Sequence, residues 1–141
     1  MTPAEFFQSL TREVPRRLPA DLARFQHRRQ GRILKIHYGR PEVHFEAWHH
    51  LRGGRLEIGL HVEGKPDLNR RGFELLRSRM VEVKSELPAA ELEPWDRSWC
   101  RLYQTLPAAE LDASLAEAAA ALLAAYIRSL QPLAEEILAS G

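Results

Sequence analysis

Apolar positions recur with a helical period near the N-terminus of this chain and with a period of two in the segment that follows. The Thr-Pro-Ala-Glu sequence at residues 2–5 is typical of a helix start, and Pro15 interrupts the helix that it begins. Pro19 permits a second helical piece that would turn Leu22 and Phe25 toward the core. The N-terminal segment is therefore predicted to be helical.

Alternation of apolar and polar residues then predicts three strands, at residues 32–38, 43–51 and 55–62. The Gly53-Gly54 pair is typical of a two-residue hairpin turn, because glycine accepts the positive φ angles that such a turn requires. That turn would place Leu51 opposite Leu56 and His50 opposite Glu57. Pairing of the first two strands with Tyr38 opposite Val43 would place Ile36 opposite Phe45. One face of the resulting sheet is apolar and the other is polar.

The second half of the chain adds a helix and a second hairpin. Asp67 is expected to cap a helix with one apolar stripe that runs as far as Pro88. The hairpin joins strands at residues 92–95 and 99–106, and Pro94 places the first of these strands at an edge of the sheet.

The last segment, from about Asp112, is an alanine-rich helix that Pro132 should kink or restart near Ser129. Together the elements predict a single α+β domain over residues 1–141, with two layers and the order α-βββ-α-ββ-α. Its antiparallel sheet should have helices mainly on one face, because only one face is apolar. The other face would be open to water, to a ligand or to a second copy of the chain.

Composition restricts the class of protein. The chain of 141 residues has one cysteine, Cys100, which rules out an internal disulfide and disfavours a cysteine-based zinc site. Its longest apolar run, residues 118–127, has ten residues, whereas a membrane-spanning helix needs about 20. The N-terminus has no pattern typical of a signal peptide. We therefore expect a cytoplasmic protein with no membrane contact and with a buried, unreactive thiol.

The net charge of +1 conceals a gradient along the chain. Residues 1–40 carry nine Lys and Arg against three Asp and Glu, whereas residues 89–141 carry three against eight. Ends of opposite charge favour packing of the two ends, within one chain or between two chains. The alternative is a nucleic-acid surface, with the contacts Arg16, Arg17, Arg28 and Arg29. A nucleic-acid-binding domain usually has a strongly basic total, so nucleic acid is the less favoured partner.

The sharpest chemical feature is a set of side chains on the polar face: His37, His44, Glu46, His61 and Glu63. Imidazole and carboxylate groups ligate first-row metals, and they also transfer protons near neutral pH. They equally form cross-strand ion pairs that stabilise a sheet by roughly 0.2–1 kcal/mol each. Side chains on a flat sheet point in parallel directions and converge poorly on a metal. We therefore expect no metal and no cofactor, and we assign no catalytic residue.

A second set of residues is aromatic and cationic: Trp48, Trp95, Trp99, Arg101 and Tyr103. Trp99, Arg101 and Tyr103 share one side of a strand, because side chains alternate with a period of two. Such a stripe can stack bases or sugars, but Trp, Tyr and Arg are also typical anchors of protein interfaces. We interpret the set as a candidate interface.

Three segments of the chain resemble an uncharacterised bacterial family of domains of unknown function. These are residues 44–48, 56–63 and 95–103, and the most specific motif is a strand ending in Gly-Leu-His-x-Glu that is followed by a helix. The family has no established catalytic residues to transfer to this chain. The order of elements is also similar to the type III secretion chaperone-like fold, whose members are commonly homodimers that bind protein partners.

These observations favour a non-enzymatic, homodimeric protein-binding or chaperone-like module. The sequence has no P-loop, GxGxxG, HExxH, Gly-x-Ser-x-Gly or paired CxxC motif, which disfavours the standard enzyme classes. One alternative is a small metal-binding protein or enzyme that uses His44, Glu46 and His61. The other alternative is nucleic-acid binding through the N-terminal arginines.

Overall fold

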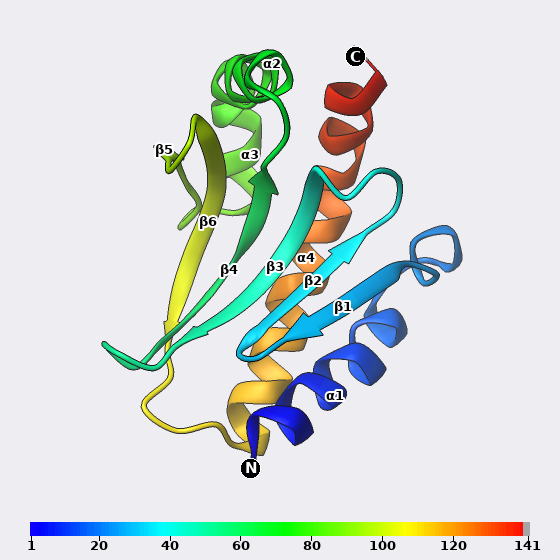
Figure 1. The fold of residues 1–141 in the computed structure, drawn as a ribbon. Coiled ribbons are helices and arrows are strands. Elements are labelled where there is room, and N and C mark those ends of the chain that lie inside the picture. Colours follow the sequence, from blue (N-terminus) through cyan, green and yellow to red (C-terminus); the bar gives the residue numbers. More distant parts are fainter. Residues whose placement is uncertain (140–141) are drawn as a thin grey trace.

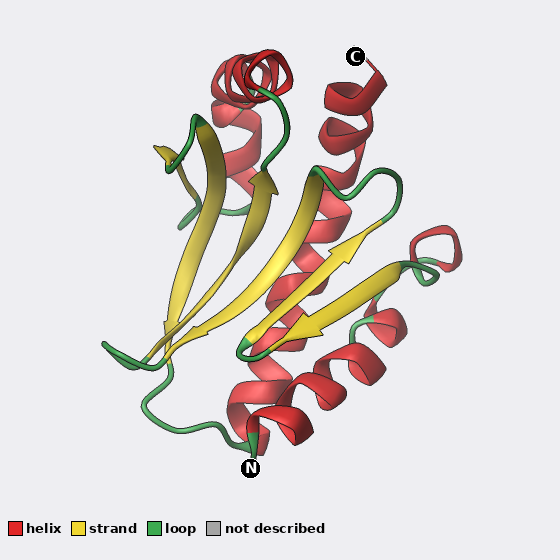
Figure 2. Cartoon of the chain, viewed as in Figure 1, coloured by secondary structure: helices red, strands yellow, loops and turns green. Residues whose placement is uncertain are grey.

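Six antiparallel strands form one sheet in the order β1-β2-β3-β4-β6-β5 (Figures 1 and 2). The structure is a computed structural model and describes residues 1–139. The strands are β1 (Gln26–Gln30), β2 (Ile33–His37), β3 (Val43–His50), β4 (Arg55–Val62), β5 (Glu91–Trp95) and β6 (Trp99–Pro107). The helices are α1 (Pro3–Glu13), α2 (Pro66–Ser78), α3 (Met80–Glu86) and α4 (Ala113–Ala139), with 3-10 turns at Pro15–Arg17 and Ala20–Leu22.

The helices pack on one face of the twisted sheet. Figure 1 shows α4 crossing behind the sheet and α1 lying beside it, and both helices contact each other. Between the layers lies an apolar core that includes Phe6, Phe45, Ile58 and Tyr126. Among the described residues, no helix lies over the opposite face, which we call the helix-free face. The prediction of an α+β domain with an antiparallel sheet and helices mainly on one face is confirmed.

Helix α4 is the central helix of the core. By length and composition alone it could cross a membrane. Its apolar side chains, among them Leu123, Ile127 and Leu130, are instead buried against the sheet, as is usual for a core helix. The helix also continues through Pro132, so the restart expected near Ser129 is not found between Ala113 and Ala139. Burial of the surrounding turns compensates for the backbone hydrogen bond that proline cannot donate.

The helical piece predicted after Pro19 is a single 3-10 turn, Ala20–Leu22, and Leu22 and Phe25 pack against the core as expected. Residues 26–30, for which the sequence predicts no strand, form the edge strand β1. All five of its residues are exposed, so no apolar alternation marks it as a strand. The strand exists because its backbone pairs with β2 across the two-residue turn Gly31-Arg32. Gly31 has a φ angle of +57°, which only glycine adopts at little cost in such a turn. The sheet therefore has six strands where the sequence predicts five.

The predicted register is correct for β2 and β3 but shifted by two residues for β3 and β4. His49, rather than Leu51, lies opposite Leu56. The reason is that the turn contains four residues, 51–54, instead of Gly53 and Gly54 alone. A shift of two keeps every side chain on its predicted face but changes its partners.

The helical region after β4 also differs from its prediction. Arg79, with φ −107° and ψ 7°, separates α2 from α3, so the apolar stripe is divided between two helices. Helix α2 begins at Pro66 with Lys65 as its N-cap, which places Asp67 inside the first turn rather than at the cap. The Asn69 side chain accepts a hydrogen bond from the Gly64 amide at 2.7 Å and donates one to the Gly64 carbonyl at 2.8 Å. These bonds hold the loop that follows β4.

Candidate functional site

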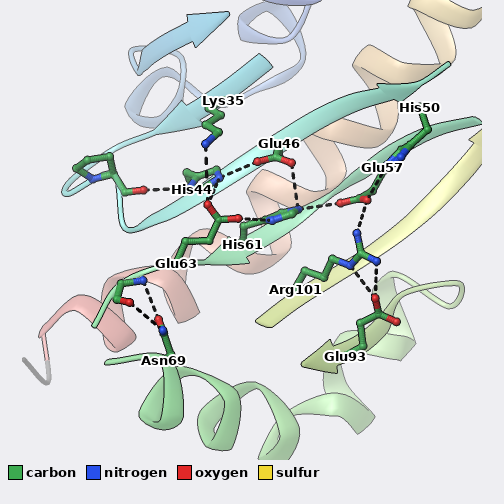
Figure 3. A network of polar contacts seen from close by, with 12 residues as sticks. Lys35, His44, Glu46, His50, Glu57, His61, Glu63, Asn69, Glu93 and Arg101 are labelled. Atoms are coloured by element: carbon green, nitrogen blue, oxygen red, sulfur yellow. Dashed lines mark hydrogen bonds and ion pairs between the residues drawn. The ribbon is translucent and has the colours of Figure 1, made fainter. Parts of the chain in front are cut away.

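Polar side chains cross the helix-free face in a continuous row from β3 to β5 (Figure 3). His44 on β3 lies opposite His61 on β4, and the two rings stack with centroids 5.5 Å apart. His61 in turn lies opposite Arg101 on β6, which lies opposite Glu93 on β5. Arg101 donates hydrogen bonds to Glu93 and, over 2.6 Å, to Glu57. The network thus links four adjacent strands.

The centre of this network is buried although no helix covers it. The exposed fraction is 3% for His44 and Glu46 and 0% for His61. Trp95 presents its ring at 87° to the imidazole of His61, with centroids 5.8 Å apart. The guanidinium of Arg101 lies 4.9 Å from the centroid of Trp95. Aromatic side chains of the face itself therefore shield the network from water, which increases the strength of its electrostatic interactions.

Four of these side chains bring potential ligand atoms together: His44, Glu46, His61 and Glu63. One imidazole nitrogen or carboxylate oxygen from each lies within 4.8 Å of the others. His44 Nε2 is 3.0 Å from Glu46 Oε1 and 3.9 Å from Glu63 Oε1, and His61 Nε2 is 3.5 Å from Glu46 Oε2. The expectation of parallel, non-converging side chains does not describe this face, because the sheet is strongly twisted (Figure 1).

Gly59 lies beside the cluster, where β4 and β6 approach closely. It is between Glu57 and His61 on the same face of β4, and those two side chains meet at 2.8 Å. A Cβ atom at Gly59 would lie 2.4 Å from the Leu102 carbonyl oxygen and 2.5 Å from Cβ of Tyr103. The close approach of β4 and β6 therefore requires glycine here.

The hydrogen bonds of His44 place a proton on Nδ1 and require a proton or a metal ion between Nε2 and Glu46. The carbonyl oxygen of Pro41 can only accept, so the Nδ1 of His44, 2.9 Å away, carries a proton. In the neutral imidazole Nε2 then presents a lone pair to Glu46 at 3.0 Å. Two acceptors do not approach this closely unless a proton or a metal ion lies between them. A proton or a metal ion therefore lies between His44 and Glu46.

His61 is positively charged in the metal-free protein. Burial alone would lower the pKa of His61, but hydrogen bonds with Glu57 and Glu63 outweigh this effect and raise the pKa to about 9. Burial would likewise raise the pKa of Glu57 and of Glu63, whereas their hydrogen bonds with His61 hold both pKa values below the ordinary value. An imidazolium between carboxylates is the result.

A hollow of about 420 Å³ opens beside the cluster. Its wall includes His44 and Glu63 of the cluster, and also Arg28, Lys35 and His37. Lys35 Nζ lies 3.9 Å from Glu63 Oε1. Two of the four potential ligands thus belong to the wall of the hollow, with 3% of the His44 side chain and 12% of the Glu63 side chain exposed.

The structure brings four of the five predicted polar-face residues together and leaves the fifth apart. His37 lies at the wall of the hollow, where its Nε2 is 2.7 Å from Gln26 Oε1. Glu57 is missing from the predicted set, although its period-two spacing from His61 places it on the same face. The predicted register, which is shifted by two residues, places Glu57 opposite His50 near the end of the hairpin. In the structure Glu57 contacts both His50 and His61.

The predicted aromatic set lies together on the helix-free face. The ring centroid of Trp95 is 6.1 Å from that of Trp48 and 5.9 Å from that of Trp99. The Arg101 guanidinium lies 4.2 Å from the centroid of Tyr103. All five residues are partly buried, so they cover the polar network and also present some surface to solvent.

The remaining candidates lie elsewhere in the fold. Cys100 is buried, as expected, on the opposite face, and burial raises the pKa of its thiol to about 12. Arg16 and Arg17 follow α1 and form ion pairs with Glu13. The nucleic-acid candidates are therefore divided between this helix end and the edge strand β1, which carries the other two arginines.

Comparisons with known proteins identify no family for this chain. No family model matches the chain, and no curated protein or solved structure is found to match it. The resemblance to a bacterial family of domains of unknown function and to the type III secretion chaperone-like fold therefore stays a prediction from the sequence.

Proposed function

We propose that this protein binds a divalent first-row transition metal ion through His44, Glu46, His61 and Glu63. The observation that carries the proposal is the convergence of four buried or nearly buried ligand atoms within 4.8 Å on a face that a solute can reach. This function is the second of the hypotheses that the sequence favours. It takes first place because the four ligand atoms converge.

The spacing of the ligand atoms suits an ion of this size. Metal–ligand bonds of about 2.0–2.2 Å in a tetrahedron place the ligand atoms about 3.3–3.6 Å apart. The distances from His44 Nε2 to Glu46 and Glu63 are 3.0 and 3.9 Å, and that from His61 Nε2 to Glu46 is 3.5 Å. Small side-chain rotations are therefore enough to form the site. An ion would also replace the protons that now separate the imidazoles from the carboxylates.

The surroundings of the four residues resemble those of metal ligands. A histidine ligand usually donates its second ring N–H to a carbonyl or carboxylate, as His44 does to Pro41. Two imidazoles and two carboxylates suit zinc, manganese, iron, cobalt or nickel, whereas a site for copper(I) would need softer sulfur ligands. Cys100 lies on the opposite face and supplies no such ligand.

The proposal is tested by titrating chelator-treated protein with Zn²⁺ or Co²⁺ in a calorimeter. We expect one ion per chain for the wild type and at least a tenfold loss of affinity for His44→Gln and for Glu46→Gln. His37→Gln is the matched control, because His37 lies on the same face but outside the cluster, and it should bind as the wild type does. Absence of binding, or binding that survives both cluster substitutions, would refute the proposal.

A second candidate function is that of a homodimeric protein-binding module, the first hypothesis from the sequence. It is favoured by the partly buried aromatic side chains of Trp48, Trp95, Trp99 and Tyr103, which lie side by side on the helix-free face. Such residues are common anchors of interfaces. Light scattering at tens of micromolar protein tests it, and a monomer at that concentration would contradict it.

A further inference from the structure

We infer that the hollow beside the metal site binds the carboxylate or phosphate group of a small metabolite, with Arg28 and Lys35 as its contacts and the metal ion as its third partner. This inference rests on the proposed metal site and names the class of ligand that the site takes. Carboxylate and phosphate groups are both oxyanions, and the hollow would recognise this shared chemistry. The reasons lie in the charges, the pairing and the shape of the hollow.

Two cations face each other at the wall of the hollow. Arg28 on β1 lies directly opposite Lys35 on β2, so both side chains project from the helix-free face. Like charges in this position destabilise a sheet. Within residues 1–139, the side chain of Arg28 has no hydrogen-bond or ion-pair partner, and the ion-pair partner of the Lys35 side chain is Glu63 at 3.9 Å. An anion between the two side chains would remove the repulsion.

The acidic residues of the hollow do not cancel this charge. Glu42 forms an ion pair with Arg40 at 3.9 Å, and Glu63 already accepts a hydrogen bond from His61 at 2.9 Å. When Glu63 ligates a metal ion, the ion neutralises part of the Glu63 charge and weakens its attraction for Lys35. The metal-loaded hollow would therefore present Arg28, whose side chain has no partner, and a less well paired Lys35 beside the ion.

The hollow places an anion next to the metal ion. His44 and Glu63 belong both to the metal site and to the wall of the hollow, so the ion would lie at its inner end. A transition metal ion with four protein ligands can accept a fifth, and carboxylate and phosphate oxygens are suitable donors. A volume of about 420 Å³ lies in the range of small-molecule sites, so the oxyanion has room to be part of a larger molecule.

The test uses the chain of 141 residues loaded with Co²⁺, and the visible absorption spectrum of the bound Co²⁺ reports its coordination. Inorganic phosphate and malonate are titrated separately, and these two arms distinguish a phosphate group from a carboxylate. The variants are Arg28→Ala, Lys35→Ala and Arg28→Lys. The control is Arg52→Ala, which removes the same charge from the exposed turn after β3, and the Co²⁺ affinity of each variant is measured directly.

We expect at least one of the two anions to change the Co²⁺ spectrum at a saturable site. Its affinity should fall at least tenfold in Arg28→Ala and in Lys35→Ala, recover in part in Arg28→Lys, and stay unchanged in Arg52→Ala. If Co²⁺ binds but neither anion alters its spectrum, or if Arg28→Ala and Lys35→Ala bind the anion as the wild type does, the inference is wrong while the metal site stands. If Co²⁺ itself does not bind, both the metal site and the inference are overturned.

Discussion

Replacement of Gly59 by alanine tests how closely β4 and β6 approach at the site. A methyl group at Gly59 would lie 2.4 Å from the Leu102 carbonyl oxygen and 2.5 Å from Cβ of Tyr103, well inside van der Waals contact. These atoms belong to the backbone and first side-chain carbon of a central strand, so they cannot rotate away. Overpacking of this kind costs about 1–3 kcal/mol, and we expect about 3 kcal/mol here.

Urea denaturation followed by circular dichroism measures this loss. With a slope of about 1–3 kcal/mol per molar urea, a loss of about 3 kcal/mol lowers the midpoint by about 1 M or more. The matched control is Gly39→Ala, whose methyl group would lie 3.4 Å from the mobile Cδ1 of Leu138. We expect it to change the free energy of unfolding by less than about 0.5 kcal/mol. If Gly59→Ala is as stable as Gly39→Ala, β4 and β6 are not packed as described.

Three further predictions concern the polar network and the thiol. The pKa of His61 is raised from 6.5 to about 9. In chelator-treated protein, the contribution of protonated His61 to the free energy of unfolding is therefore complete below about pH 6.5 and is lost as the pH rises through 9. The free energy of unfolding should then fall by up to about 3 kcal/mol over this range, and a constant value in urea titrations would contradict the network. Arg101→Met removes an ion-pair partner of the buried Glu57 and should lower the free energy of unfolding by about 3 kcal/mol in the same assay. The control Arg52→Met should lower it by less than about 0.5 kcal/mol. Equal losses in the two variants would show that Arg101 does not stabilise Glu57. Cys100 is buried, and burial raises the pKa of its thiol to about 12. Ellman's reagent should therefore label this thiol only as fast as the protein unfolds. Rapid labelling of the folded protein would place the thiol at the surface.

The fold class follows from the sequence because its period-two segments have one apolar and one polar face. The register of β2 and β3 is confirmed for the same reason. The edge position of β5 is confirmed because Pro94 lacks the backbone N–H that a central strand needs. Strand β1 could not be predicted from alternation, since all of its residues are exposed and only its backbone holds it in the sheet. Gly31, which precedes β2, was the one local sign of a turn there.

The members of the metal cluster could be predicted, but their arrangement could not. Alternation places His44, Glu46, His61 and Glu63 on one face, and the error of two residues in the turn after β3 leaves that face unchanged. Convergence of the four side chains depends on the twist of the sheet. Their burial depends on aromatic residues of β5 and β6, such as Trp95, which lie far away along the chain. Neither effect can be derived from the spacing of residues within a strand.

X-ray diffraction from crystals grown with Zn²⁺, recorded at the zinc absorption edge, tests the central claim most directly. We predict one anomalous peak on the helix-free face, at about 2.0–2.2 Å from an imidazole nitrogen of His44 and of His61 and from carboxylate oxygens of Glu46 and Glu63. A map with no peak there, in which His44 and His61 keep their hydrogen bonds to the carboxylates, would contradict the proposal and identify the cluster as an ion-pair network of the sheet.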